Sequence, residues 1–112
     1  MMYEVIISKR AREMLLRHTL FLSYVSLPAA KILRQEFNTV INKLRENPMQ
    51  FQVEEDLNLP KGKYRRAVFA KRYKIVYSIR ETSVYVDSIV DCRSLDSGLS
   101  RVSQAYFEVH RI

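Results

Sequence analysis

Apolar and polar residues alternate with two different periods along the chain. In the first half, apolar residues recur every three or four positions in two stripes: Ala11, Met14, Leu15, Leu22 and Val25, then Ala30, Leu33, Phe37, Val40, Ile41 and Leu44. This spacing predicts two helices. Beyond residue 62 the period becomes two, which predicts strands over about 64–70, 73–80 and 84–91.

Short local signals mark where the elements begin and end. The β-branched run at residues 3–7 predicts a first strand, and Ser8 after it is a good N-cap for the first helix. Pro28 separates the two helices, and Pro48 ends the second. Residues 48–62 are predicted to form a loop. The resulting order, β-α-α-β-β-β, predicts an α+β fold in which a helical hairpin packs on one face of a mainly antiparallel four-stranded sheet.

Strand pairing assigns each side chain to the helix side of the sheet or to the opposite side, called here the open face. A hairpin with its tip at residues 81–82 predicts these helix-side pairs: Ile79 with Val84, Tyr77 with Val86, Ile75 with Ser88, and Tyr73 with Val90. A tip at residues 71–72 predicts that Arg65 joins Lys74 on the open face and that Arg66 lies on the helix side. Asp87 and Asp91 are expected on the open face as ion-pair partners of nearby cations.

Composition narrows the class of protein. The chain has 112 residues, 47% hydrophobic and 28% charged, which is typical of one globular domain spanning 1–112. A single cysteine, Cys92, excludes an internal disulfide framework and a Cys-based zinc site, and we expect neither metal nor cofactor. Without a signal-peptide pattern or an apolar stretch of membrane-spanning length, we expect a cytoplasmic protein with no membrane partner.

The net charge of +7 is concentrated in one segment. Residues 61–80 contain no acidic residue and eight basic ones: Lys61, Lys63, Arg65, Arg66, Lys71, Arg72, Lys74 and Arg80. Such a concentration is typical of a surface that binds nucleic acid or an acidic protein. The alternative is a basic face that is neutralised by solvent counterions alone.

Several strings in order resemble the RelE/ParE family of bacterial type II toxin–antitoxin toxins, also called plasmid stabilisation proteins. They are Tyr3-Glu-Val-Ile-Ile-Ser8, Asn47-Pro48, Lys63-Tyr64-Arg65-Arg66, Tyr73-Lys74-Ile75-Val76-Tyr77 and Tyr85-Val86-Asp87-Ser88-Ile89-Val90-Asp91-Cys92-Arg93. The resemblance covers about residues 3–94. It implies a small toxin fold of two helices on an antiparallel sheet, and a co-expressed antitoxin whose C-terminal segment wraps and neutralises the toxin.

The resemblance also implies two possible activities, because RelE-like members cleave mRNA on the ribosome and ParE-like members poison DNA gyrase. The positions that match the ribonuclease pattern are Arg65, Lys74, which stands where the family uses an arginine, and Arg93. Two elements depart: Ala67 replaces a second basic residue, and Leu99 stands near the place of a tyrosine. Whether the chain is an enzyme therefore stays open, and the departures favour a ParE-like toxin.

Three hypotheses follow for function. The first is a toxin that binds a macromolecular target, with gyrase favoured; the second is a ribosome-dependent mRNA endonuclease; the third is a non-toxic basic interaction module on the same fold. The residues expected to bind the target or the antitoxin are Lys63, Arg65, Arg66, Lys71, Arg72, Lys74, Arg80 and Arg93. The C-terminal extension, residues 95–112, has apolar residues at helical steps and is expected to form a helix that completes the core.

Overall fold

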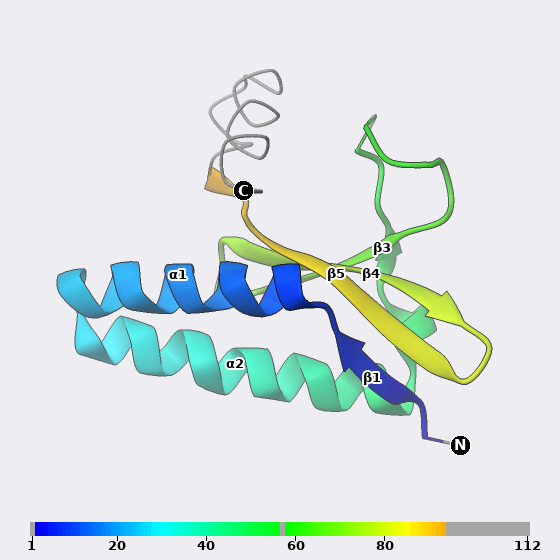
Figure 1. The fold of residues 1–112 in the computed structure, drawn as a ribbon. Helices are drawn as coiled ribbons and strands as arrows, with labels where there is room; N and C mark the ends of the chain where they lie inside the picture. The colour runs from blue at the N-terminus through cyan, green and yellow to red at the C-terminus, as the bar shows by residue number, and fades with distance from the viewer. Residues whose placement is uncertain (1, 57, 94–112) are drawn as a thin grey trace.

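Two helices cover one face of a five-stranded mixed sheet (Figure 1). The computed structural model describes residues 2–56 and 58–93. The elements are β1 (Glu4–Ile7), α1 (Lys9–Val25), α2 (Leu27–Glu46), the 3-10 turn η1 (Pro48–Gln50), β2 (Gln52–Val53), β3 (Arg65–Phe69), β4 (Tyr73–Arg80) and β5 (Ser83–Asp91). Position 99 and the expected C-terminal helix lie outside the described residues.

The helical hairpin forms where the sequence predicts it. The hydroxyl oxygens of Ser8 and Ser26 accept hydrogen bonds from amides in the first turns of α1 and α2, at 3.0 and 3.3 Å. Each cap therefore satisfies one backbone N–H that has no partner inside its helix. The predicted α1 stripe points inward except at Val25, the last residue of the helix, which is exposed, and the α2 stripe is buried along its whole length. The fold class, α+β with a helical hairpin on the sheet, is confirmed.

The sheet has one strand more than predicted. Its order is β1-β5-β4-β3-β2, with β1 parallel to β5 and every other neighbouring pair antiparallel. The fifth strand is β2, a two-residue edge strand within the segment predicted to be a loop, and it pairs with Arg66 and Arg65 of β3. The prediction of four strands is wrong because so short a strand has little room for a period-two signal of its own.

The register between β3 and β4 differs by one residue from the predicted register. Arg65 pairs with Tyr77 and Phe69 with Tyr73, because the turn begins one residue earlier, at Ala70. Ala70 and Lys71 both adopt left-handed backbone, with φ of 49° and 68°. Such turns usually carry glycine or asparagine, so the sequence gives no warning. The Glu36 carboxylate accepts a hydrogen bond from the Ala70 amide at 2.8 Å and ties this turn to α2.

A one-residue shift moves every side chain of β3 to the other face of the sheet. Phe69 packs against Phe37 of α2 with ring centroids 5.9 Å apart, so this alternating set lies on the helix side. Arg65 belongs to the same set. The prediction that placed Arg65 on the open face and Arg66 on the helix side is therefore wrong, and the two arginines exchange places.

A β-bulge divides the pairing of β4 with β5. Ile79 with Val84 and Tyr77 with Val86 are confirmed. Beyond these pairs, Asp87 lies opposite no residue of β4. The facing residues then become Val76 with Ser88, Ile75 with Ile89 and Tyr73 with Asp91. The predicted pairs of Ile75 with Ser88 and Tyr73 with Val90 are wrong because the bulge inserts one extra residue into β5. Asp91 therefore lies on the helix side rather than on the open face.

The hydroxyl of Tyr77 is buried in the core and donates a hydrogen bond to the Pro48 carbonyl oxygen at 2.5 Å. Burial raises the pKa of Tyr77 from 10.0 to about 12, and the nearby Arg65 guanidinium opposes this shift. The pKa of Tyr77 is higher in the folded than in the unfolded state. The contribution of its neutral hydroxyl to stability is therefore complete below pH 10 and is lost as the pH rises from 10 to 12.

We expect the free energy of unfolding to fall by about 2 kcal/mol across that interval because of Tyr77. Urea denaturation at pH 9 and pH 11.5 measures the change. The Tyr77→Phe variant keeps the ring but cannot ionise, so its stability should fall less over the same interval. An equal fall in both proteins would contradict the assignment.

Candidate binding surface on the open face

Most cations of the basic segment are spread along the sheet rather than gathered at one point. Three of them lie over aromatic rings: Arg80 over Tyr85 at 4.5 Å, Arg72 over Tyr73 at 5.3 Å and Lys63 over Tyr64 at 5.5 Å. Arg80 is at the tip of the β4–β5 hairpin, whereas Arg72 and Lys71 are at the β3–β4 turn, at the opposite end of β4. Cation–ring contacts of this kind hold a side chain in place without neutralising its charge.

Arg65 donates hydrogen bonds to the backbone of the segment formed by η1 and the start of β2. Its Nη1 donates to the carbonyl oxygens of Phe51 and Met49, at 2.6 and 3.5 Å. These bonds fasten η1 and the start of β2 to β3. Arg65 therefore connects β3 to the edge segment, on the side of the sheet away from Lys74.

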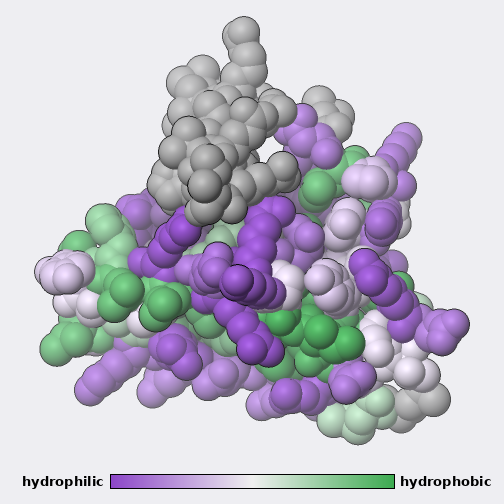
Figure 2. Space-filling view, in the orientation of Figure 1, coloured by the Kyte–Doolittle hydropathy of each residue, from purple (hydrophilic) through white to green (hydrophobic). Residues whose placement is uncertain are grey.

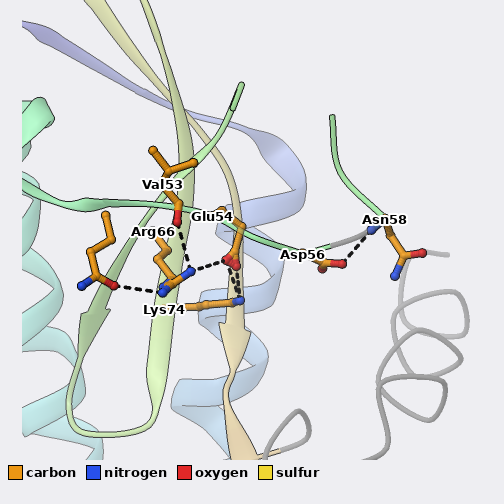
Figure 3. Close-up of polar contacts among 7 residues, drawn as sticks. Val53, Glu54, Asp56, Asn58, Arg66 and Lys74 are labelled. Carbon is orange, nitrogen blue, oxygen red and sulfur yellow. Dashed lines mark hydrogen bonds and ion pairs between the residues drawn. The ribbon is translucent and has the colours of Figure 1, made fainter. Parts of the chain in front are cut away.

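Arg66 and Lys74 instead meet on the open face, around a single carboxylate (Figure 3). The expectation that this face is open is wrong at its centre, where Val76, Ser78 and Val90 are buried. Lys74 Nζ donates to both carboxylate oxygens of Glu54, at 2.9 Å to Oε2. Arg66 Nη1 lies 3.7 Å from the same Oε2. The Glu54 side chain is 2% exposed, that of Lys74 10% and that of Arg66 28%. We call these three residues the Glu54 cluster; it carries two positive charges and one negative charge.

The Arg66 guanidinium is also fixed by neutral acceptors. Nη1 donates to the Val53 carbonyl oxygen at 3.1 Å, and Nη2 donates to Gln52 Oε1 at 2.9 Å. Neither contact offsets the positive charge. The Glu54 carboxylate is thus the only acidic group with a described contact to either cation.

Arg93 follows β5 and is half-exposed. Its Nη2 lies 3.3 Å from Asp91 Oδ2, and its backbone amide donates to Asp91 Oδ1 at 2.9 Å. The prediction that Asp91 is an ion-pair partner of nearby cations is confirmed for Arg93. Asp87 pairs with Arg10 of α1, at 3.7 Å, and not with a cation of the basic segment.

His18 lies between α1 and the sheet. Its Nε2 is 2.9 Å from the Ile89 carbonyl oxygen, and its ring centroid is 5.1 Å from that of Tyr73. Because a carbonyl oxygen only accepts, Nε2 carries the hydrogen in the neutral ring. Burial lowers the pKa of His18, against the opposing effects of the Ile89 hydrogen bond and of Asp91. We interpret His18 as a packed, uncharged histidine.

Of the three positions that match the ribonuclease pattern, none shares a site with another. Arg65 faces the helix side, Lys74 is paired with Glu54, and Arg93 is paired with Asp91. Stabilising a pentacoordinate phosphorus requires cations that converge on one point. Among the described residues no group of three or more His, Cys, Asp or Glu side chains is arranged to hold a metal ion.

Sequence reasoning missed two features of the surface. Glu54 lies in the segment predicted to be a loop, because the alternation of Phe51 and Val53 with Gln52 and Glu54 is too short to predict a strand. The second feature is an apolar stripe on the outer face of α1, Leu16, Leu20 and Tyr24, opposite the stripe that is buried. Figure 2 shows apolar side chains gathered at the end of the helical hairpin that points away from the sheet.

The spacing of four residues in this outer stripe is visible in the sequence, but its exposure is not. Phe21, Val25 and Leu27 are exposed around the same end of the hairpin. Several large apolar side chains exposed together are typical of a protein-binding surface. Within the described residues, neither helix is long and apolar enough to cross a membrane.

Comparison with known proteins gives no information on function. No protein-family model matches the sequence, and no curated protein matches it at a significant level.

Proposed function

We propose that this chain is the toxin of a bacterial type II toxin–antitoxin pair, and that it arrests growth by binding a macromolecular target, with DNA gyrase favoured. The ordered strings and the helical hairpin on a sheet support the family. One observation favours binding over RNA cleavage: Arg65, Lys74 and Arg93 are separated from one another, and each is engaged by a different partner. Such a set suits a ParE-like toxin better than a ribonuclease.

The partner that neutralises the toxin is then a cognate antitoxin with an acidic segment. Arg72, Lys71 and Arg80 lie at the two ends of β4, so the basic charge extends along the strand rather than forming one pocket. An extended acidic segment fits such a distribution better than a small ligand does. The exposed apolar end of the hairpin adds a second surface of the kind that proteins bind.

Induction of the chain without its antitoxin should arrest growth, and the purified protein should inhibit supercoiling by gyrase while leaving in vitro translation unchanged. The Arg93→Ala variant should remain toxic, because it removes one of several expected binding cations and no scissile phosphate depends on Arg93 in this mechanism. Supercoiling and translation assays on the same preparation measure the difference.

Each alternative gives a different result in these experiments. Codon-phased cuts in mRNA from induced cells, together with loss of toxicity in Arg93→Ala, would establish the ribosome-dependent endonuclease and exclude the gyrase mechanism. Normal growth on induction would indicate a non-toxic interaction module, whose affinity for nucleic acid should fall steeply with salt.

A further inference from the structure

The Glu54 cluster has the composition of an anion site that is already filled. Two cations from neighbouring strands of the sheet converge on one point, and the oxygens of Glu54 occupy that point (Figure 3). Arg66 comes from β3 and Lys74 from β4, whereas Glu54 follows β2 at the sheet edge. Carboxylate and phosphate oxygens accept the same kind of charge-assisted hydrogen bond, so a carboxylate can stand where a phosphate would bind.

Strand pairing fixes the backbones of both cations, and Arg66 also has side-chain contacts other than those with Glu54. The backbones of Arg66 and Lys74 are fixed by the β3–β4 pairing, in which Arg66 lies opposite Val76 and Lys74 opposite Val68. The Arg66 guanidinium is also held by the Val53 carbonyl and the Gln52 side chain. Removing the Glu54 charge would therefore leave two cations close together in a partly buried site, with a net charge of +2.

The site can be reached from solvent on the Arg66 side. A hollow of about 270 Å³ is lined by Gln50, Phe51, Gln52, Arg66 and Val68. The planar guanidinium at its wall can offer parallel N–H groups to a phosphate. Arg66 is thus the member of the cluster that an anion in the hollow can contact.

We propose that Arg66 and Lys74 form a phosphate-binding site, and that Glu54 occupies it as an internal counter-ion and so keeps the open face from binding nucleic acid. A phosphate of a polyanion fits better than a single carboxylate of an acidic peptide. A peptide carboxylate would only replace the Glu54 carboxylate with a group of the same kind. It would also compete with Glu54, which is held close to the cations because it is part of the same chain. This inference concerns the open face itself and does not depend on the proposed toxicity.

The Glu54→Gln variant tests the site against a matched control, Glu55→Gln. Glu55 is the adjacent, exposed carboxylate, so both variants gain the same net charge. The probes are a fluorescent single-stranded RNA of twelve nucleotides and poly-glutamate, with affinities measured by anisotropy between 50 and 200 mM salt.

For Glu54→Gln we expect RNA affinity at 50 mM salt to rise about tenfold, and the salt slope to steepen by about 1.4 as two cations become available. Glu55→Gln should change affinity less than about twofold, and adding Lys74→Met to Glu54→Gln should remove most of the gain. Equal affinities of Glu54→Gln and Glu55→Gln for RNA would overturn the proposal. So would tighter binding of Glu54→Gln to poly-glutamate than to RNA, which would indicate a carboxylate site.

Thermal unfolding with inorganic pyrophosphate keeps the test decisive if Glu54→Gln folds poorly. A filled site stabilises the folded state by mass action. Pyrophosphate should therefore raise the Tm of Glu54→Gln more than that of Glu55→Gln, or restore its folded circular-dichroism spectrum, whereas sodium chloride at the same ionic strength should not. No selective stabilisation by pyrophosphate would overturn the proposal, while growth arrest on induction tests the proposed function separately.

Discussion

Lys74→Met is expected to lower the free energy of unfolding by about 3–5 kcal/mol, because it leaves a buried carboxylate without its principal partner. Lys74 donates to both oxygens of Glu54, whose side chain is 2% exposed. Arg66, 3.7 Å from the carboxylate, offsets part of the loss, so we expect the lower end of this range. Urea denaturation followed by circular dichroism at pH 7 gives the value. A loss of less than about 1 kcal/mol would contradict the buried pair.

A double variant separates the cost of an unpaired charge from the worth of the pair. Glu54→Leu combined with Lys74→Met should regain most of the stability, since replacing both partners of a buried ion pair by apolar groups is often close to neutral. Lys71→Met is the surface control. Lys71 is exposed in the β3–β4 turn, and its replacement should change stability by less than about 0.5 kcal/mol. Strictly additive losses in the double variant would show that the two side chains do not interact.

The helices and the helix-facing side of β4 could be predicted from the sequence because burial there follows a regular period. Both serine caps and both prolines lie where a helix boundary needs them. In β4 the alternation of Tyr73, Ile75 and Tyr77 matches the helix side of the sheet. These features depend on local propensity and hydrophobic period, and both are properties of a short stretch of chain.

The faces of the sheet could not be predicted fully because they depend on two single-residue offsets. The left-handed turn at Ala70 and Lys71 exchanges Arg65 and Arg66 between the faces of the sheet. The bulge at Asp87 moves Asp91 to the helix side. Neither position carries glycine, so no turn signal marks the offset. Whether a charged side chain lies on the open face is decided by these offsets, whereas the total charge of the chain is unaffected by them.

Leu33→Ala is expected to lower the free energy of unfolding by about 2–5 kcal/mol. Leu33 is fully buried at 0% exposure within the α2 stripe that covers the sheet. Truncation removes apolar surface that folding takes out of water, and it leaves a cavity that the surrounding helix and strands cannot fill completely. Denaturant unfolding with a matched slope for both proteins gives the difference.

Leu20→Ala on the outer stripe of α1 is the matched control, because it is the same chemical change in the middle of the neighbouring helix. Leu20 is 51% exposed, so its truncation should change stability by less than about 0.5 kcal/mol. If the exposed end of the hairpin binds the target or the antitoxin, Leu20→Ala should weaken toxicity or neutralisation while the protein stays fully folded. A loss of stability equal to that of Leu33→Ala would instead mean that the outer stripe is covered within the chain.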